Sequence, residues 1–250
     1  MKYIDINTMI GPSIDKVHCN TAEELIKYMD SYHAFSAVTA HNGAFVDPAK
    51  YNGEMANTAK DSVGHMRACL ILDPMLAENS LPGTGSLYDR LKALRPAAVR
   101  MYPRSTNYPF DVFFCGHILE TLNILRLPLL LSETEAPPVR EIVSTAKVFP
   151  DLPIVLLRDG FCRSRTIAPM LTKLPNIYID TATLIDTGLL EELVNRFGAE
   201  DRLMIGSGLP YHVPAGSLAL VTYSTITDEQ KEKILFKNWE KLEGGIRYDD

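Results

Sequence analysis

The sequence predicts an α/β fold, a single (β/α)8 (TIM) barrel, from three observations. Eight short runs of branched and other apolar residues recur along the chain, each bounded by turn residues and too short for a helix. Helical patterns separate most of these runs, which is typical of a parallel sheet. The length of 250 residues is the usual size of one such barrel. We therefore expect one domain over residues 1–250.

The eight expected strands follow one another along the whole chain. They lie at Tyr3–Thr8, Ala34–Ala40, Met66–Leu72, Ala97–Tyr102, Leu127–Leu131, Ile154–Leu157, Ile177–Asp180 and Leu203–Ile205. An open doubly wound sheet could be built from the same alternation of elements. No glycine-rich nucleotide fingerprint follows the first strand, where the sequence reads IDINTMIGPS, and this favours the closed barrel.

Five of the intervening segments carry clear helix signals. Capping-box patterns at Thr21 and at Thr227 predict that helices begin there. Three further segments place their apolar residues on one face: Gly116–Arg126, Val139–Phe149 and Leu189–Phe197. An apolar outer helix of this kind fits either packing against the barrel or a contact between copies, so a homo-oligomer stays open.

Composition excludes some classes of partner. The formal net charge of −6 provides no basic field for a general nucleic-acid binder. The opening MKYIDINTMIG has the pattern of a strand, and no apolar run approaches the length that spans a bilayer. We therefore expect a cytoplasmic protein with neither nucleic acid nor membrane as a partner.

Barrels of this type take their functional residues from the C-terminal ends of the strands and the loops that follow. The candidate ligand-binding residues at these positions are Asn7, Met9, His41, Arg100, Tyr102, Ser132, Arg158, Ser207 and Gly208. Guanidinium groups bind carboxylate or phosphate in bidentate fashion, so Arg100 and Arg158 predict a small anionic ligand. In the alternative hypothesis the arginines form a structural network with neighbouring acids, which are Glu133, Glu135, Asp159 and Asp180.

Several segments, taken in order, resemble the amidohydrolase-related (second amidohydrolase) family of metal-dependent hydrolases and decarboxylases. IDINTMIG is similar to the family's first strand, and FPDLPIVLLRDG is similar to its sixth. FGAEDRLMIGSGLPYH is similar to its last strand, and TDEQKEKILFKNWEKL is similar to its closing helix. The resemblance implies a TIM barrel with a site at its C-terminal mouth.

The positions that hold the family's metal carry other residues here. The two histidines of the first strand fall on Asn7 and Met9, those of strands five and six on Ser132 and Arg158, and the last-strand aspartate on Gly208. Thioether, guanidinium and glycine do not make a zinc or manganese ligand set. We therefore expect no metal and no other cofactor, although histidines that converge from distant strands would not show in the spacing.

Two functional hypotheses follow. The first is a divergent hydrolase that acts on a small anionic substrate without the family's metal, as the pyrone-dicarboxylate lactonase type within the family does. Those relatives keep the water-activating aspartate, so this chain needs a substitute base, and the candidates are Glu133, Asp159 and His212. The second is a non-catalytic pseudoenzyme that binds a small anion or a protein partner.

Overall fold

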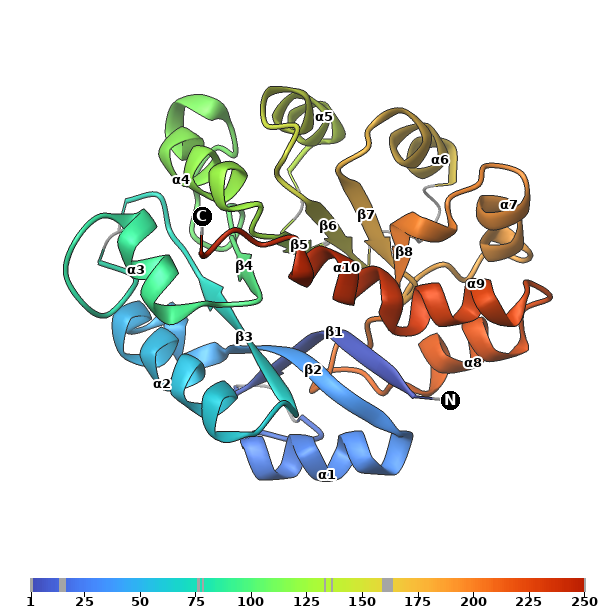
Figure 1. Ribbon diagram of the computed structural model, residues 1–250, viewed down its shortest axis with the longest axis horizontal. Helices are drawn as coiled ribbons and strands as arrows, with labels where there is room; N and C mark the ends of the chain where they lie inside the picture. Colours follow the sequence, from blue (N-terminus) through green and yellow to red (C-terminus); the bar gives the residue numbers. More distant parts are fainter. Residues whose placement is uncertain are drawn as a thin grey trace.

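The strands form one parallel sheet in the order of the sequence, as the computed structural model shows (Figure 1). Its described residues are 2–13, 17–75, 77, 79–132, 134–135, 137–158 and 164–249. The strands are β1 (Tyr3–Ile10), β2 (Ala34–His41), β3 (Met66–Ile71), β4 (Ala98–Arg100), β5 (Leu129–Ser132), β6 (Ile154–Leu157), β7 (Ile177–Asp180) and β8 (Leu203–Met204). Each of the eight expected strands is present, so the (β/α)8 barrel prediction is confirmed.

Hydrogen bonds between β1 and the segment that begins at β8 close the barrel. The Ile6 N–H donates to the Ile205 carbonyl at 3.1 Å, and the Met9 N–H donates to the Leu209 carbonyl at 2.8 Å. In the other direction, the Gly208 N–H donates to the carbonyl of Asn7 at 2.9 Å. This closure places two of the candidate site residues, Asn7 and Gly208, on adjoining backbones.

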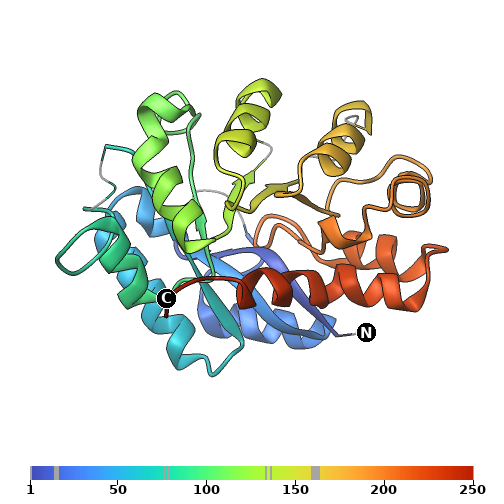
Figure 2. The ribbon, with the colours of Figure 1, turned by 45° about the horizontal axis from the view of Figure 1, so that its top comes forward.

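Helices surround the strands on the outside of the barrel (Figures 1 and 2). The α-helices are α1 (Ala22–Tyr32), α2 (Pro48–Asp61), α3 (Leu87–Leu94), α4 (Val112–Leu125), α5 (Val139–Val148), α6 (Ser164–Lys173), α7 (Leu189–Asn195), α8 (Ala215–Tyr223), α9 (Asp228–Glu232) and α10 (Asn238–Gly244). Short 3-10 turns occupy η1 (Asn42–Phe45) and η2 (Glu200–Arg202), and η3 (Lys233–Lys237) is a π-helical turn. In the described part of the chain, no helix has the length and apolar character needed to cross a membrane.

The caps decide where the predicted helices begin. Thr21 and Thr227 each form the expected capping box, with Glu24 and Gln230 respectively. Helix α4 begins at Val112, earlier than the predicted Gly116, because the side chain of Asp111 accepts the Phe114 N–H at 3.0 Å.

The C-terminal helix α10 closes the end of the barrel where the strands begin. Its Trp239 is 1% exposed and packs inside the barrel with Ile4 and Ile6. After this helix the chain crosses that face, where the Arg247 N–H donates to the carbonyl of Leu125 at 2.8 Å. This helix does not cover the opposite end, where the strands finish.

A β-bulge in β1 turns two candidate residues toward that open end. Asp5 pairs with Ala37 and Thr8 with Thr39, so β1 has one residue more than β2 over this stretch. The carboxylate of Asp5 accepts the Asn7 N–H at 3.1 Å within the bulge. Asn7 and Met9 therefore face the barrel mouth, directly above the apolar interior.

Candidate functional site

A cavity of about 390 Å³ lies at the C-terminal mouth of the barrel. Residues from the ends of β1, β4 and β5 and from the segments that follow β2, β4, β5, β6 and β8 line it. They are Asn7, Met9, Asn42, Phe45, Arg100, Tyr102, Ser105, Ser132, Thr134, Glu135, Arg158, Gly208, Leu209, Tyr211 and His212. Seven of the nine predicted ligand-binding residues are among them, and so is His212, one of the three predicted bases.

The two other ligand-binding candidates lie away from the cavity lining. His41 accepts the Gly43 N–H at 3.0 Å and stacks on the ring of Tyr51 at 4.7 Å, so it caps the 3-10 turn η1. Ser207 is 2% exposed, and its hydroxyl accepts the Leu209 N–H at 3.0 Å. Strand-end position alone could not distinguish these local contacts from a ligand contact. The other two predicted bases, Glu133 and Asp159, lie outside the described residues.

Arg100 forms the floor of the cavity. Its side chain is 3% exposed, and its Nη2 donates to Asn7 Oδ1 at 3.0 Å. Its buried Nε has no hydrogen-bond partner among the described residues, and none of their carboxylates forms an ion pair with it. Tyr102 and Cys69 also interact with this guanidinium, but neither is a carboxylate that neutralises it. A buried cationic group that lines the cavity without an ion-pair partner favours an anionic ligand there.

Arg158 stands at the end of β6 with an unusual backbone conformation. Its φ is 57°, in the left-handed region that non-glycine residues seldom adopt. The Arg158 N–H donates to Asp180 Oδ1 at 2.7 Å, which holds this conformation in place. Arg158 lines the cavity, and among the described residues no carboxylate forms an ion pair with its guanidinium.

Gly208 leaves the space that Arg158 and His212 occupy. A Cβ at position 208 would stand 3.1 Å from His212 Cδ2 and 3.4 Å from both Arg158 Cδ and Nη1. The φ of Gly208 is 83°, which glycine adopts at little cost. The imidazole and guanidinium therefore lie around the point from which the family's aspartate would project.

The pKa of His212 lies below its usual value. Partial burial is the main cause, and the charge of Arg158 lowers the pKa further. His212 is consequently neutral at pH 7 and carries a free lone pair on one ring nitrogen. That is the state required of a general base.

Two acids that could have neutralised the arginines are engaged elsewhere. Glu135 accepts the backbone N–H groups of Arg104 at 3.1 Å and Ser105 at 2.8 Å, and so fixes the loop after β4. Asp180 is fully buried and accepts the N–H of Arg158 and, at 3.3 Å, that of Ala182. For these two acids, the predicted network of side-chain ion pairs is replaced by hydrogen bonds to the backbone.

Two carboxyl groups lie buried beneath the cavity. Burial raises the pKa of Asp5 to about 6 and that of Asp180 to about 7, although hydrogen bonds from neighbouring groups oppose the shift. Gly206 makes room for one of them, because a Cβ there would stand 2.5 Å from Asp180 Oδ2. Both acids remain within the wall of the barrel, out of reach of a ligand in the mouth.

Aromatic side chains that the sequence analysis did not single out form part of the rim. Phe45, in the turn after β2, packs edge-on against Tyr102 with their ring centroids 4.5 Å apart. Tyr211, in the loop after β8, accepts a hydrogen bond from Asn42 Nδ2 at 3.1 Å. The only sequence signal for Phe45 and Tyr211 is that each lies shortly after a strand end. No spacing pattern connects the two residues, so the sequence does not predict that they line the same cavity.

The donors in the cavity do not fit a divalent metal. All five positions implied by the resemblance, Asn7, Met9, Ser132, Arg158 and Gly208, do line this one cavity. However, Asn7 Oδ1 already accepts from Arg100, and Met9 Sδ accepts from the Tyr102 hydroxyl at 3.7 Å. Across the described residues, no group of three or more His, Cys, Asp or Glu side chains could hold a metal ion. Two guanidinium charges would also repel a cation.

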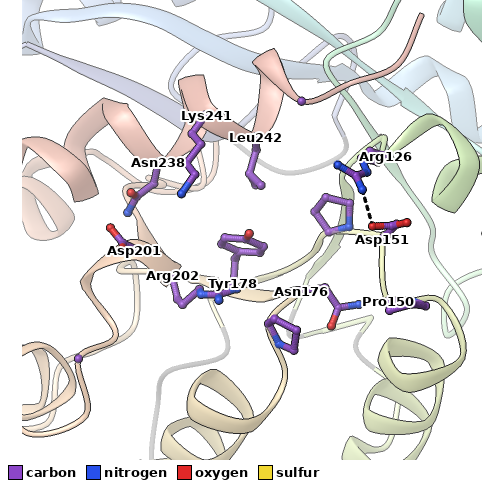
Figure 3. A pocket seen from close by; sticks show the side chains of 14 residues that line it. Arg126, Pro150, Asp151, Asn176, Tyr178, Asp201, Arg202, Asn238, Lys241 and Leu242 are labelled. Atoms are coloured by element: carbon purple, nitrogen blue, oxygen red, sulfur yellow. Dashed lines mark hydrogen bonds and ion pairs between the residues drawn. The ribbon is translucent and has the colours of Figure 1, made fainter. Parts of the chain in front are cut away.

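A second hollow, of about 420 Å³, lies at the other end of the barrel, below the starts of β6 and β7 (Figure 3). Several of its polar groups hold the fold together. Arg126 pairs with Asp151 at 2.8 Å, and Asn176 Nδ2 donates to three backbone carbonyls. Asn238 Nδ2 likewise donates to two carbonyls at 2.7 Å. These contacts are typical of the N-terminal face of such barrels, which serves stability.

Comparisons with known proteins support the fold. No protein-family model and no curated protein sequence matches this chain. A proposed amidohydrolase from Staphylococcus aureus is 16% identical, with a TM-score of 0.76 over 98% of this chain and 100% of that one. A TIM-barrel protein from Bordetella bronchiseptica is 14% identical, with a TM-score of 0.78 over 98% and 99%. A dihydroxybenzoic acid decarboxylase from Polaromonas, with bound manganese and 2-nitroresorcinol, is 14% identical, with a TM-score of 0.72 over 97% of each chain.

These likenesses extend over nearly the whole length of both chains. They confirm the TIM-barrel fold that the sequence motifs indicated. At identities of 12–16% they carry no activity across to this chain.

Proposed function

We propose that this protein binds a small carboxylate-bearing molecule in the mouth of the barrel and hydrolyses it without a divalent metal. The observation that carries the proposal is the grouping around Gly208, where the guanidinium of Arg158 and the neutral imidazole of His212 lie side by side. Arg100 adds a second guanidinium at the cavity floor. The site thus combines a clamp for an anion with a base.

The chemistry that fits is hydrolysis of an activated ester or lactone. The arginines would hold the substrate carboxylate and the oxyanion that develops as water attacks the carbonyl carbon. His212 would take a proton from that water as the new C–O bond forms. When the old C–O bond breaks, the imidazolium returns this proton to the leaving oxygen, so His212 ends neutral.

Small aromatic carboxylates are suitable first ligands. Phe45, Tyr102 and Tyr211 give the cavity an aromatic rim. Three of the similar structures are described as dihydroxybenzoate decarboxylases, one of them complexed with 2,6-dihydroxybenzoate. The likeness of fold supports the choice of this compound as a probe, and the arginines supply the reason for it to bind.

Thermal shift with benzoate, 2,6-dihydroxybenzoate, malonate and inorganic phosphate tests the binding step. A ligand at 100 times its Kd stabilises the folded state by about 2.7 kcal/mol, which raises Tm by roughly 5–10 °C in a chain of this size. Arg158→Ala should abolish this shift. Arg104→Ala is the matched control, because the Arg104 side chain is exposed outside the cavity lining. A shift that survives in Arg158→Ala, or no shift with any probe, contradicts the anion site.

A second function, anion binding without catalysis, is favoured by a different observation. Glu135 and Asp180, acids beside or beneath the cavity, are occupied by backbone N–H groups. Neither is therefore placed to orient His212, as a carboxylate does in catalytic triads. His212→Gln separates the two functions. Loss of ester or lactone hydrolysis with retained benzoate binding supports the enzyme, whereas a wild-type protein that binds but turns over no substrate supports the binding protein.

A further inference from the structure

Asn7 connects the two charged regions of the site through its amide group. Its Oδ1 accepts a hydrogen bond from Arg100 Nη2 at 3.0 Å, and its Nδ2 donates to Asp180 Oδ2 at 3.4 Å. The side chain is 6% exposed. The orientation of the amide therefore decides whether Arg100 meets an acceptor or a second donor.

Asp180 fixes the direction of these hydrogen bonds. Above its pKa of about 7 it is a carboxylate, which accepts and does not donate, so the binding measurements below are made at about pH 8. It takes the N–H of Arg158, the N–H of Ala182 and the amide of Asn7. Three other charged or titratable groups lie beside Asn7 and Asp180. Asp5 on β1 accepts the backbone N–H of Asn7, Arg100 on β4 donates to the Asn7 side chain, and the charge of Arg158, directly after β6, lowers the pKa of Asp180. Because Asp180 accepts from Asn7, Oδ1 of Asn7 is directed at Arg100.

We infer that Asp180 is a positioning residue for both arginines of the site. Through its Oδ1 it holds the left-handed backbone of Arg158, and through Asn7 it anchors the guanidinium of Arg100. One buried carboxylate on β7 thus sets the geometry of side chains on β6 and β4. This inference rests on the proposed anion site and identifies what orients its two cationic groups.

The two hydrogen bonds that connect Asp180 to Asn7 and Asn7 to Arg100 are called the relay below. Gly206 leaves the space in which Asp180 and Asn7 lie. A Cβ at this position would stand 2.5 Å from Asp180 Oδ2 and 3.0 Å from the Cβ of Asn7. The backbone passes this close only because residue 206 has no side chain. A side chain at position 206 would therefore displace Asp180 or Asn7 and disturb the hydrogen bond between them.

Asp180→Asn reverses the polarity of the relay with almost no change of shape. The new amide could still accept the two backbone N–H groups with its oxygen, but its NH₂ would then face the NH₂ of Asn7. Asn7 would have to flip and present a donor to Arg100. We expect the affinity for benzoate or 2,6-dihydroxybenzoate to fall about tenfold, the usual effect of one hydrogen bond to a charged group.

The double variant Asn7→Asp with Asp180→Asn should restore binding. Its amide at position 180 donates to a carboxylate at position 7, whose other oxygen still accepts from Arg100, and the total charge equals that of the wild type. Asn7→Asp alone places two carboxylates face to face and should weaken binding. We expect the double variant to bind within about threefold of wild type.

The cycle of four proteins gives distinct outcomes. The inference is wrong if the affinity losses of the two single variants add in the double variant, or if Asp180→Asn binds the probe as tightly as the wild type does. If the wild-type protein binds none of the probes, the proposed function fails, and the relay is then judged by Tm alone. Two singly substituted proteins with lower Tm and a double variant near wild type support it, and additive losses of Tm contradict it. If Asp180→Asn does not fold, Asn7→Asp and the double variant supply the same comparison.

Discussion

Asp180 accepts the backbone N–H of Arg158 at 2.7 Å, and this contact connects a fully buried carboxyl group to a residue that faces the cavity. Arg158 has a φ of 57°, a conformation that costs a side-chain-bearing residue on the order of 1 kcal/mol. The short hydrogen bond offsets part of that cost. The direction in which the guanidinium enters the mouth is thus decided one strand away, at the end of β7.

Gly206→Ala should destabilise the protein by about 1–3 kcal/mol, because the new methyl group overlaps Asp180 Oδ2 at 2.5 Å. Gly216→Ala is the control. Gly216 lies in α8 with no atom near the new methyl group, so alanine should add up to about 1 kcal/mol of stability through helix propensity. Urea unfolding of the two variants measures both changes. Equal effects would show that the space beside Asp180 is not tightly packed.

Gly208→Asp should close the anion site. The new side chain starts 3.4 Å from the Arg158 guanidinium, so its carboxylate would pair with this group and compete with an external anion. We expect at least a roughly tenfold loss of benzoate affinity by calorimetry, the effect of one charged hydrogen bond. Gly208→Ala controls for the left-handed φ of 83°, which either substitution strains. If both variants lose affinity equally, strain alone explains the effect.

The stability of the protein should fall as pH rises from about 4 to 7. Asp5 and Asp180 have folded-state pKa values of about 6 and 7 against an ordinary 3.8, so the folded state holds protons that the unfolded state releases. Each group contributes stability that is fully present below the ordinary pKa of 3.8 and is lost as pH rises through its folded pKa, at up to about 1.4 kcal/mol per pH unit. Chemical unfolding across this range tests the sign. Asp5→Asn should flatten the slope, and a slope of the opposite sign would contradict the burial argument.

Hydrolysis should lose rate on the acid side only below the ordinary histidine pKa of 6.5. The pKa of His212 is depressed by burial and by Arg158, so the neutral base persists below that value and is lost as pH falls through its own pKa. A profile of kcat/KM from about pH 4.5 to 8 reports the free enzyme and shows this acid-side loss, which Arg158→Lys should retain because it keeps the charge. A limb centred above the ordinary value of 6.5 would rule out the depressed imidazole as the base.

Purified protein should contain well under one equivalent of zinc, manganese or iron. The basis is the donor set, in which Arg158 and Arg100 bring positive charge and Asn7 Oδ1 is already hydrogen bonded. Elemental analysis before and after dialysis against a chelator measures this, with Tm recorded in both states. One tightly bound equivalent, lost together with several degrees of Tm, would be incompatible with the proposed chemistry.

Local patterns in the sequence determined the fold because they reflect local physics. Apolar runs of strand length, capping boxes at Thr21 and Thr227, and the alternation of elements each act over a few residues. The one boundary that moved appreciably, the start of α4, moved because Asp111 provides an N-cap that the apolar pattern does not reveal.

The sequence by itself also determined which residues are available at the strand ends, and seven of the nine predicted binding residues do line the cavity. It could not decide that His41 and Ser207 would form hydrogen bonds to nearby backbone, since a histidine or serine at a strand end looks the same in either role.

Only the tertiary structure decided how those residues act together. Asn7 and Asp180 are 173 positions apart, and their hydrogen bond exists because closure of the barrel brings β1 near β7. Two of the acids expected to neutralise the arginines accept hydrogen bonds from the backbone instead. Glu135 accepts the N–H of Arg104 in the loop after β4, and Asp180 accepts the N–H of Arg158. A sequence specifies which charges are present. Which of these charges form ion pairs depends on the distances between them in the closed barrel. In that arrangement the guanidinium groups of Arg100 and Arg158 line the cavity at the mouth.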